Sequence, residues 1–159
     1  MQEYRFSKNL EDNYKLMVGT VKAFLDGEPN TIANLSNTSA IINEYVTAIN
    51  WVGFYLMEDD ELVLGPFQGK PACIRIPIGR GVCGTTAQRK ETIIVRDVHQ
   101  FSGHIPCDAA SNSEIVIPIM KNGEVFGVLD IDSPEFNRFT ELEKKYLEEV
   151  VAIIEASLV

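Results

Sequence analysis

Three carboxyl groups are predicted to meet at one end of a β-hairpin in the C-terminal half of the chain. Asn122 and Gly123 form the strongest short-range hairpin signal, and the return strand carries Asp130 and Asp132 two residues apart. Alternate residues of a strand point to the same face, so these two acids lie together among apolar neighbours. Glu114 begins the partner strand, and the hairpin brings it beside them. Three acids on an otherwise apolar hairpin therefore indicate a site rather than core packing.

Three cysteines supply the other reactive groups. Cys107 lies in the polar loop before the hairpin, Cys73 lies in a loop before a short strand, and Cys83 lies in a glycine-rich turn that opens a helix. The helix N-terminus favours a thiolate at Cys83, whereas the charge of Asp108 disfavours one at Cys107. The loop that contains Cys107 is expected to close over the acidic hairpin. Local chemistry thus favours Cys83 as the nucleophile, and position favours Cys107.

The composition indicates one soluble globular domain. The chain has 159 residues, of which 45% are hydrophobic and 23% charged, and its formal charge is -9. We expect a single domain over residues 1–159, and the negative charge argues against nucleic acid or an anionic membrane as a partner. No apolar run approaches the roughly 20 residues that span a bilayer, and the N-terminus lacks the apolar segment of a signal peptide. Three cysteines without an export signal predict a cytoplasmic protein.

Residues 50–57 are rich in aromatic and β-branched side chains, which is typical of a strand. Trp51 and Tyr55 lie on one face of this strand, while Val52 and Phe54 lie on the other. A lone tryptophan most often packs in a core. Because Trp51 and Tyr55 share a face in the sheet that carries the acidic hairpin, we predict that they form a wall of the pocket.

Helices are predicted near both ends of the chain. Apolar residues recur at helical spacing over residues 9–26 and 31–49, with Asn9 and Asn30 as N-caps. A capping box at Thr140 opens an amphipathic final helix. The residues predicted to face the core are Leu10, Tyr14, Met17, Val21, Phe24 and Leu25 in the first helix, and Ile32, Leu35, Ile42, Tyr45, Val46 and Ile49 in the second.

The remaining patterns predict a sheet and one long loop. The predicted strands are residues 50–57, 61–67, 71–78, 91–95, 115–120 and 125–132, and residues 79–88 form a glycine-rich turn that opens a short helix. Residues 96–112 show no periodicity, which is typical of a lid or a binding segment. We predict an α+β fold in which an antiparallel sheet carries the N- and C-terminal helices on one face and a loop-lidded ligand pocket on the other.

Other ligand classes fit the sequence less well. The glycine-rich turn lacks the Gly-Lys-Ser/Thr of a phosphate loop. The cysteines, taken with His99 and His104, lack the Cys-x-x-Cys and His-x-x-x-His spacing of a zinc site. Asp130 and Asp132 lack the glycine and the bidentate glutamate of a calcium loop. We interpret the two histidines as solvated polar residues and expect no metal.

Four motifs carry a resemblance to a known family. They are residues 50–55 (NWVGFY), 79–84 (GRGVCG), 105–108 (IPCD) and 129–133 (LDIDS). The order of elements resembles a GAF domain, and over essentially the whole chain these motifs closely resemble the free methionine-(R)-sulfoxide reductases. The combination of three cysteines with three acids is far more specific than the GAF architecture, which hosts many ligands.

The resemblance implies that the chain reduces free L-methionine-(R)-sulfoxide to methionine. Cys107 would attack the sulfoxide sulfur and become a sulfenic acid, and Cys73 would convert it to a disulfide. Cys83 would be a buried bystander or a secondary relay. Glu114 or Asp132 would protonate the departing oxygen, since crowding and burial raise the pKa of a carboxyl group.

The resemblance also implies how the substrate and the reductant are bound. Glu114, Asp130 and Asp132 would pair with the ammonium group of free methionine sulfoxide, and Trp51 and Tyr55 would face its S-methyl end. No cofactor is implied. Thioredoxin would recycle the disulfide, and the family allows a homodimer.

Two functions of other classes stay open. The first is a non-catalytic GAF module that binds a small ligand, although such modules usually regulate an attached output domain. The second is a thiol-based redox sensor, which needs a partner that detects the disulfide. Methionine release from free methionine sulfoxide in the presence of a thiol separates all three.

Overall fold

One antiparallel sheet of six strands forms the centre of the protein, in the order β3-β2-β1-β6-β5-β4. The computed structural model describes residues 9–105 and 108–159. Every neighbouring pair of strands runs antiparallel. The strands are β1 (Trp51–Glu58), β2 (Glu61–Gly69), β3 (Arg75–Pro77), β4 (Ile93–Val95), β5 (Ser113–Lys121) and β6 (Glu124–Ser133). The prediction of an α+β fold with an antiparallel sheet is confirmed.

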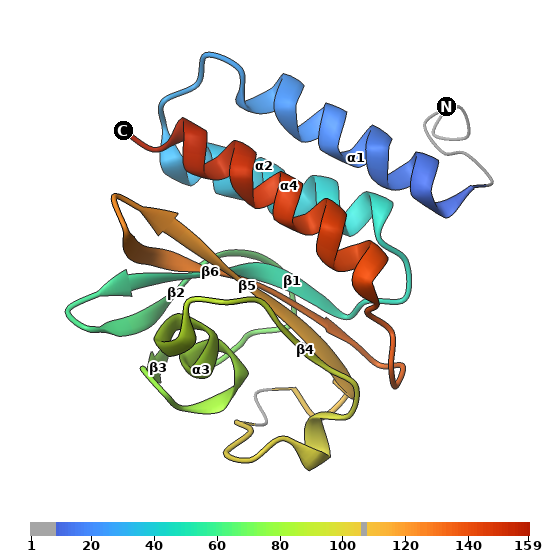
Figure 1. Cartoon of the computed structure of the whole chain (residues 1–159), viewed down its shortest axis with the longest axis vertical. Helices are drawn as coiled ribbons and strands as arrows, with labels where there is room; N and C mark the ends of the chain where they lie inside the picture. The colour runs from blue at the N-terminus through green and yellow to red at the C-terminus, as the bar shows by residue number, and fades with distance from the viewer. Residues whose placement is uncertain (1–8, 106–107) are drawn as a thin grey trace.

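Three helices lie on one side of the sheet, and a fourth lies on the other (Figure 1). The helices are α1 (Leu10–Leu25), α2 (Thr31–Tyr45), α3 (Gly81–Arg89) and α4 (Glu141–Ser157). α2 and α4 pack on the sheet, α1 lies across both of them, and α3 covers the opposite face. The prediction that the N- and C-terminal helices share one face is confirmed. No helix within the described ranges is long and apolar enough to cross a bilayer.

Side-chain caps determine where three of the helices begin. Asn9 and Asn30 each accept a hydrogen bond from the backbone N–H three residues further on, at 3.1 and 2.9 Å. Thr140 and Glu143 form the predicted capping box, in which the Glu143 carboxylate accepts from the Thr140 N–H at 2.7 Å. Because these bonds satisfy N–H groups that a helix start leaves free, all three predicted caps are confirmed.

The predicted core-facing stripes of the first two helices are too wide. Leu10, Phe24 and Ile32 are 45%, 56% and 58% exposed, so their assignment to the core is wrong. α1 packs mainly against α2 and α4, and it buries a narrow stripe along that side. Apolar residues at the margins of the stripe therefore stay in solvent.

α2 ends at Tyr45, four residues before the predicted end at residue 49. Val46 leaves the helical region with a ψ of 112°, and Ala48 takes a left-handed φ of 57°. These two residues turn the chain from the helical layer towards β1, which begins at Trp51. The helix therefore ends before Ile49, although the apolar periodicity continues to that residue, because the chain must turn here to reach β1.

The Asn122-Gly123 turn joins β5 to β6. Both residues have positive φ, at 53° and 79°, as a two-residue type I′ turn requires. The predicted hairpin is confirmed. The turn pairs Lys121 with Glu124, and a register shift between Ile119 and Met120 then moves the pairing by one residue, so that Glu114 faces Asp132 near the far end of the hairpin.

Two segments on the α3 side differ from the prediction. The predicted strand over residues 71–78 shrinks to β3, because only Arg75–Pro77 pair with β2 at the edge of the sheet. The predicted loop over residues 96–112 contains a 3₁₀ turn, η2 (Val98–Gln100), in its described part. The function of this loop as a lid stays a prediction.

The two faces of β1 enter separate apolar cores. Val52 and Phe54 pack with the helical layer, whereas Trp51 and Tyr55 pack with α3 and its neighbours. The predicted division of these four residues between the faces is confirmed. The helical face supplies the larger core, and the α3 face supplies the surroundings of the site.

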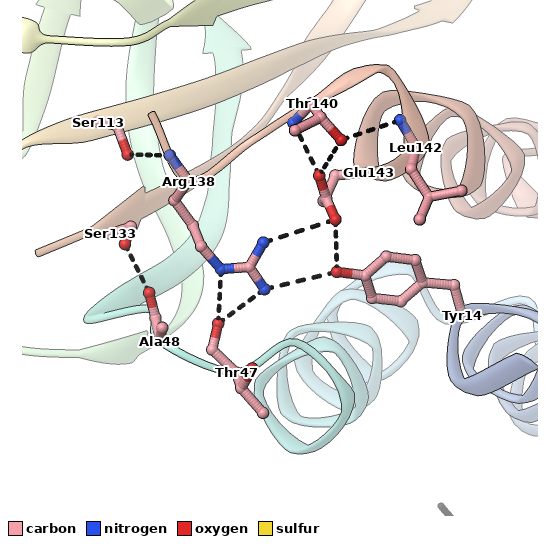
Figure 2. Close-up of polar contacts among 9 residues, drawn as sticks. All are labelled: Tyr14, Thr47, Ala48, Ser113, Ser133, Arg138, Thr140, Leu142 and Glu143. Carbon is pink, nitrogen blue, oxygen red and sulfur yellow. Dashed lines mark hydrogen bonds and ion pairs between the residues drawn. The ribbon is translucent and has the colours of Figure 1, made fainter. Parts of the chain in front are cut away.

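A polar cluster ties the helical layer to the segment that leaves β6 (Figure 2). Arg138 donates from Nε and Nη2 to the carbonyl of Thr47 at 3.1 and 3.0 Å, and its Nη1 lies 3.5 Å from a Glu143 oxygen. The same carboxylate oxygen accepts a hydrogen bond from the Tyr14 hydroxyl at 2.7 Å. α1, the turn before β1 and α4 are thereby joined close to the acidic end of the sheet.

Candidate active site

A cavity opens on the face of the sheet that carries α3. It encloses about 550 Å³ when the open space at its mouth is included, which lies in the range of small-molecule sites. Its walls come from β1, β5, β6, α3 and the loops that follow β2 and η2. Six predicted site residues line it: Trp51, Tyr55, Cys83, Glu114, Asp130 and Asp132.

The hairpin brings the three carboxyl groups together at the cavity. Glu114 faces Asp132 directly across β5 and β6, and Asp130 lies two residues along β6, opposite Val116. Glu114 and Asp130 are only 7% and 5% exposed, whereas Asp132 is half-buried. Asp130 Oδ1 is buried and has no hydrogen-bond partner among the described residues. An unpartnered buried oxygen in a cavity wall is a free acceptor for a ligand.

Burial raises the pKa of all three carboxyl groups. The charges of Asp130 and Asp132 add to this effect at Glu114, and the charge of Asp130 adds to it at Asp132, so both pKa values lie well above their ordinary range. The pKa of Asp130 rises less, because hydrogen bonds from Glu114, Cys83 and Asp132 act against burial. The cluster therefore holds its protons to a higher pH than free carboxyl groups do.

Cys83 is a free, buried thiol in the first turn of α3. Its pKa lies well above its ordinary value, first because of burial and then because of the negative charges of Asp130, Glu114 and Asp132. The expectation that the helix N-terminus favours a thiolate here is therefore wrong, because these effects outweigh the helix dipole. The predicted burial of Cys83 is confirmed.

Cys83 and two of the acids form the one close group of potential metal donors in the described part of the chain. The Cys83 sulfur and the oxygens of Glu114 and Asp130 lie within 4.8 Å of one another. This set contains no histidine and so differs from the combination of cysteines with His99 and His104 that would suit zinc. Protons shared among these groups explain the same proximity, in keeping with their raised pKa values.

Of the other two cysteines, the structure describes Cys73 alone. Cys73 lies half-buried in the loop between β2 and β3, and it is disulfide-bonded. Cys107 lies outside the described residues. The assignment of Cys107 as nucleophile and Cys73 as resolving thiol therefore stays a prediction.

Trp51 and Tyr55 line the cavity next to each other. The Trp51 ring stacks on Phe67 with centroids 5.2 Å apart and on Tyr55 with centroids 5.9 Å apart. The Trp51 indole N–H donates to the carbonyl of Lys70 at 3.1 Å, and the Tyr55 hydroxyl donates to the carbonyl of Cys73 at 2.8 Å. The wall is thus apolar towards the cavity and polar towards the loop that carries Cys73.

Asn50 was missed by the sequence analysis. Its side-chain amide donates to Asp108 Oδ2 at 3.0 Å and to Ser111 Oγ at 3.1 Å, and both acceptors line the cavity. Asn50 thereby connects the start of β1 to the loop before β5. Its position directly before Trp51 in the first motif is the signal that could have identified it.

The two histidines divide between surface and site. His99 is exposed and lies 3.0 Å from Asn112 Oδ1, which confirms its interpretation as a solvated polar residue. His104 is half-buried and lines the cavity, so the same interpretation is wrong for it. Burial, followed by the charge of His99, lowers the pKa of His104, while Asp130 acts in the opposite direction. The loop around His104 has no periodicity from which its burial could have been predicted.

Comparison with known proteins places this chain in a family. The GAF domain model matches residues 33–159. The chain is 57% identical over 136 residues to a free methionine-R-sulfoxide reductase of Escherichia coli (strain K12), a match that covers 86% of this chain and 82% of the relative. It is 42% identical over 164 residues to the free methionine-R-sulfoxide reductase of Saccharomyces cerevisiae, covering 98% and 91%.

A solved structure agrees with these sequence matches. The fRMsr of Staphylococcus aureus in complex with substrate superposes with a TM-score of 0.89 and 53% identity, covering 92% of this chain and 96% of the other. The fold therefore agrees with that of a related protein over almost its full length.

Proposed function

We propose a reaction for this chain, which belongs to the GAF-domain family and, within it, to the free methionine-(R)-sulfoxide reductases. The reaction is the thiol-dependent reduction of free L-methionine-(R)-sulfoxide to methionine. One observation carries the proposal. Three carboxyl groups with raised pKa values line a cavity, and Tyr55 in the wall of this cavity donates a hydrogen bond to the main chain of the disulfide-bonded Cys73. This arrangement provides both an acid and redox-active sulfur for a polar substrate.

In the first step, the Cys107 thiolate attacks the electrophilic sulfur of the substrate. The sulfur–oxygen bond of the substrate breaks, the oxygen is transferred to the cysteine sulfur with a proton, and methionine leaves as the thioether. Glu114 or Asp132 supplies the proton, because the raised pKa values keep these groups protonated where ordinary carboxyl groups are ionised. The products are methionine and a cysteine sulfenic acid.

In the second step, the Cys73 thiol attacks the sulfenic sulfur, a disulfide forms, and water leaves. A dithiol reductant, thioredoxin, then attacks the disulfide and restores both thiols. The disulfide-bonded Cys73 supports this role. The raised pKa of Cys83 disfavours it as the attacking thiolate and supports its assignment as a bystander or secondary relay.

Substrate recognition uses the same acids and the aromatic wall. The ammonium group of the free amino acid pairs with the carboxyl groups, and the unpartnered Asp130 Oδ1 is the acceptor best suited to it. The S-methyl end lies against Trp51 and Tyr55, where a partly positive sulfur is favoured near an aromatic face. The lowered pKa of His104 favours its neutral form, so this imidazole adds no positive charge beside the ammonium.

The test is methionine release from free L-methionine-(R)-sulfoxide with thioredoxin, its reductase and NADPH. We expect turnover of the R epimer and none of the S epimer, and Cys107→Ser should release no methionine even in a single turnover. Cys73→Ser should release about one equivalent and then stop, as loss of the recycling thiol requires. Binding of the substrate without release would instead support a non-catalytic GAF module. Disulfide formation by a general oxidant without methionine release would support a redox sensor.

A further inference from the structure

Two aromatic side chains of β1 hold the loop that contains Cys73. Trp51 Nε1 donates to the carbonyl of Lys70, and the Tyr55 hydroxyl donates to the carbonyl of Cys73, at 3.1 and 2.8 Å. Residues 70–74 connect β2 to β3. One strand of the cavity wall thus fixes this loop at its first residue and again at the cysteine.

The two donors have little freedom to move. Trp51 and Tyr55 are only 3% and 2% exposed, and the indole ring stacks between Phe67 and Tyr55. The absence of a side chain at Gly53 makes room for this stack, because a Cβ there would lie 2.3 Å from the Cβ of Phe67 and 2.8 Å from the indole ring. The donors are therefore presented to the loop in one orientation.

We propose that Tyr55 and Trp51 are positioning residues for the step in which Cys73 forms its disulfide. This inference rests on the proposed function and adds a second role to side chains that face the substrate. By holding the main chain of Cys73, the two residues keep its thiol within reach of the sulfur that is oxidised in the cavity. Without the hydroxyl of Tyr55, the loop samples more positions and the effective concentration of the thiol falls.

Tyr55 takes no part in the bond changes of this step. The Cys73 thiol loses its proton, a sulfur–sulfur bond forms, the sulfur–oxygen bond of the sulfenic acid breaks, and the oxygen leaves as water. The oxidising equivalent comes from the sulfoxide that has already been reduced. Burial, supported by the charge of Asp130, raises the pKa of Tyr55, so its hydroxyl stays a donor throughout the cycle.

Tyr55→Phe tests the inference, because it keeps the ring in the cavity wall and removes the donor alone. A single turnover without reductant, followed by rapid quenching, measures methionine release and loss of the Cys73 thiol separately. We expect thiol loss to slow by roughly three- to tenfold relative to methionine release, the factor that corresponds to one lost hydrogen bond. More sulfenic acid should then be trapped by dimedone. Trp51→Phe should shift the same ratio in the same direction through the loss of the bond to Lys70.

Tyr14→Phe is the matched control. It removes a buried hydroxyl, which donates to Glu143 at 2.7 Å in the helical layer on the other side of the sheet. This variant should be less stable than the wild type and should show the wild-type ratio of the two rates. An equal slowing of both rates in Tyr55→Phe, or no slowing, would overturn the inference.

A redox titration in glutathione buffer tests the inference without the substrate. The equilibrium constant for closing the Cys73 disulfide should fall roughly three- to tenfold in Tyr55→Phe, for the same reason, and stay unchanged in Tyr14→Phe. If the wild type releases no methionine, the proposed function fails, while this titration still decides whether Tyr55 positions Cys73. An unchanged constant in Tyr55→Phe contradicts the positioning role alone.

Discussion

The raised pKa values of single carboxyl groups in the cavity affect both proton donation and the stability of the protein. Glu114 is ordinarily half-ionised at pH 4.5 and Asp132 at pH 3.8, and both pKa values are raised well above this in the folded protein. A group that resists ionisation remains a proton donor at a pH where the departing oxygen needs one. The raised pKa values also mean that the folded state loses stability relative to the unfolded state at a pH where these carboxyl groups are ionised in the unfolded chain.

Glu114→Gln should make the protein more stable at neutral and alkaline pH. Because the folded-state pKa of Glu114 is raised, its folding advantage is fully present below about pH 4.5 and is lost as the pH rises through the folded value. The melting temperature of the variant should therefore exceed that of the wild type by an amount that grows from pH 4.5 upward and then levels off. Each 1 kcal/mol moves the midpoint by about 2–4 °C in a domain of this size.

The exposed Glu58→Gln variant is the control for this comparison, since Glu58 lies in solvent at the end of β1. Its melting temperature should follow that of the wild type at every pH. A Glu114→Gln protein that is less stable than the wild type at pH 8 would contradict the electrostatic account.

Glu114→Gln and Asp132→Asn should lower kcat, because an amide cannot give a proton to the departing oxygen. General acid catalysis is typically worth about 10²–10⁴-fold, and the variant that removes the principal donor should lose this factor. Steady-state methionine release measures the loss in kcat. Asp59→Asn, in the exposed turn after β1, is the matched control variant. Wild-type kcat in both cavity variants would exclude these two residues as the acid.

At the scale of elements, two serines hold the ends of the acidic strands. Ser133 follows Asp132 and pairs with Ser113 across the sheet, and both serines are fully buried. The Ser133 hydroxyl donates to the carbonyl of Ala48 at 2.6 Å and accepts from the Glu135 N–H at 3.0 Å. Figure 2 shows the bond from Ser133 to Ala48 beside the Arg138 cluster. The strand end that presents Asp132 is therefore anchored to the turn before β1.

Ser133→Ala should destabilise the protein by about 1–3 kcal/mol, because the carbonyl of Ala48 loses its partner inside the protein. It should also lower kcat, since the carboxyl groups of β5 and β6 lose their fixed relation. Thermal unfolding and steady-state turnover measure the two effects. Ser36→Ala, on the exposed side of α2, should stay within about 0.5 kcal/mol of the wild type. Wild-type stability of Ser133→Ala would show that the anchor is dispensable.

Much of the fold could be predicted because its signals are local. Helix caps such as Asn9 act within one turn, and the Asn122-Gly123 turn sets a hairpin by itself. The exposure of Phe24 and the early end of α2 depend instead on which elements pack together. Apolar periodicity indicates which face of a helix is apolar, but it does not indicate how much of that face is buried by neighbouring elements.

The site divides in the same way. Strand alternation and the turn predict that Glu114, Asp130 and Asp132 lie near one end of the hairpin, whereas the register shift between Ile119 and Met120 that places Glu114 opposite Asp132 could not be predicted from the sequence. The contribution of Asn50 and His104 could not, because both depend on how an irregular loop folds back over β1 and the cavity. The raised pKa of Cys83 could not be predicted from the sequence either, since burial against three acids arises only from tertiary structure.

At the scale of the whole molecule, the cavity lies between the sheet and α3 with its loops, and three carboxyl groups line it, which we propose to bind the ammonium of a free amino acid. A methionine sulfoxide inside a peptide offers an amide in that place and leaves the buried acids unpaired. We expect kcat/KM for the peptide to be at least roughly a hundredfold lower than for the free amino acid. Parallel assays on the two substrates measure this ratio. Comparable values would contradict recognition of the ammonium group by the acids.

The separate cores on the two faces of the sheet have a consequence for how this protein can change. Val52 and Phe54 belong to the helical core, and their sequence neighbours Trp51 and Tyr55 belong to the cavity side. Substitutions at alternate positions of one strand can therefore alter ligand preference or robustness almost independently. A laboratory library confined to Trp51 and Tyr55 would vary the cavity wall while the helical core stays unchanged, and one confined to Val52 and Phe54 would vary heat stability with little effect on ligand preference.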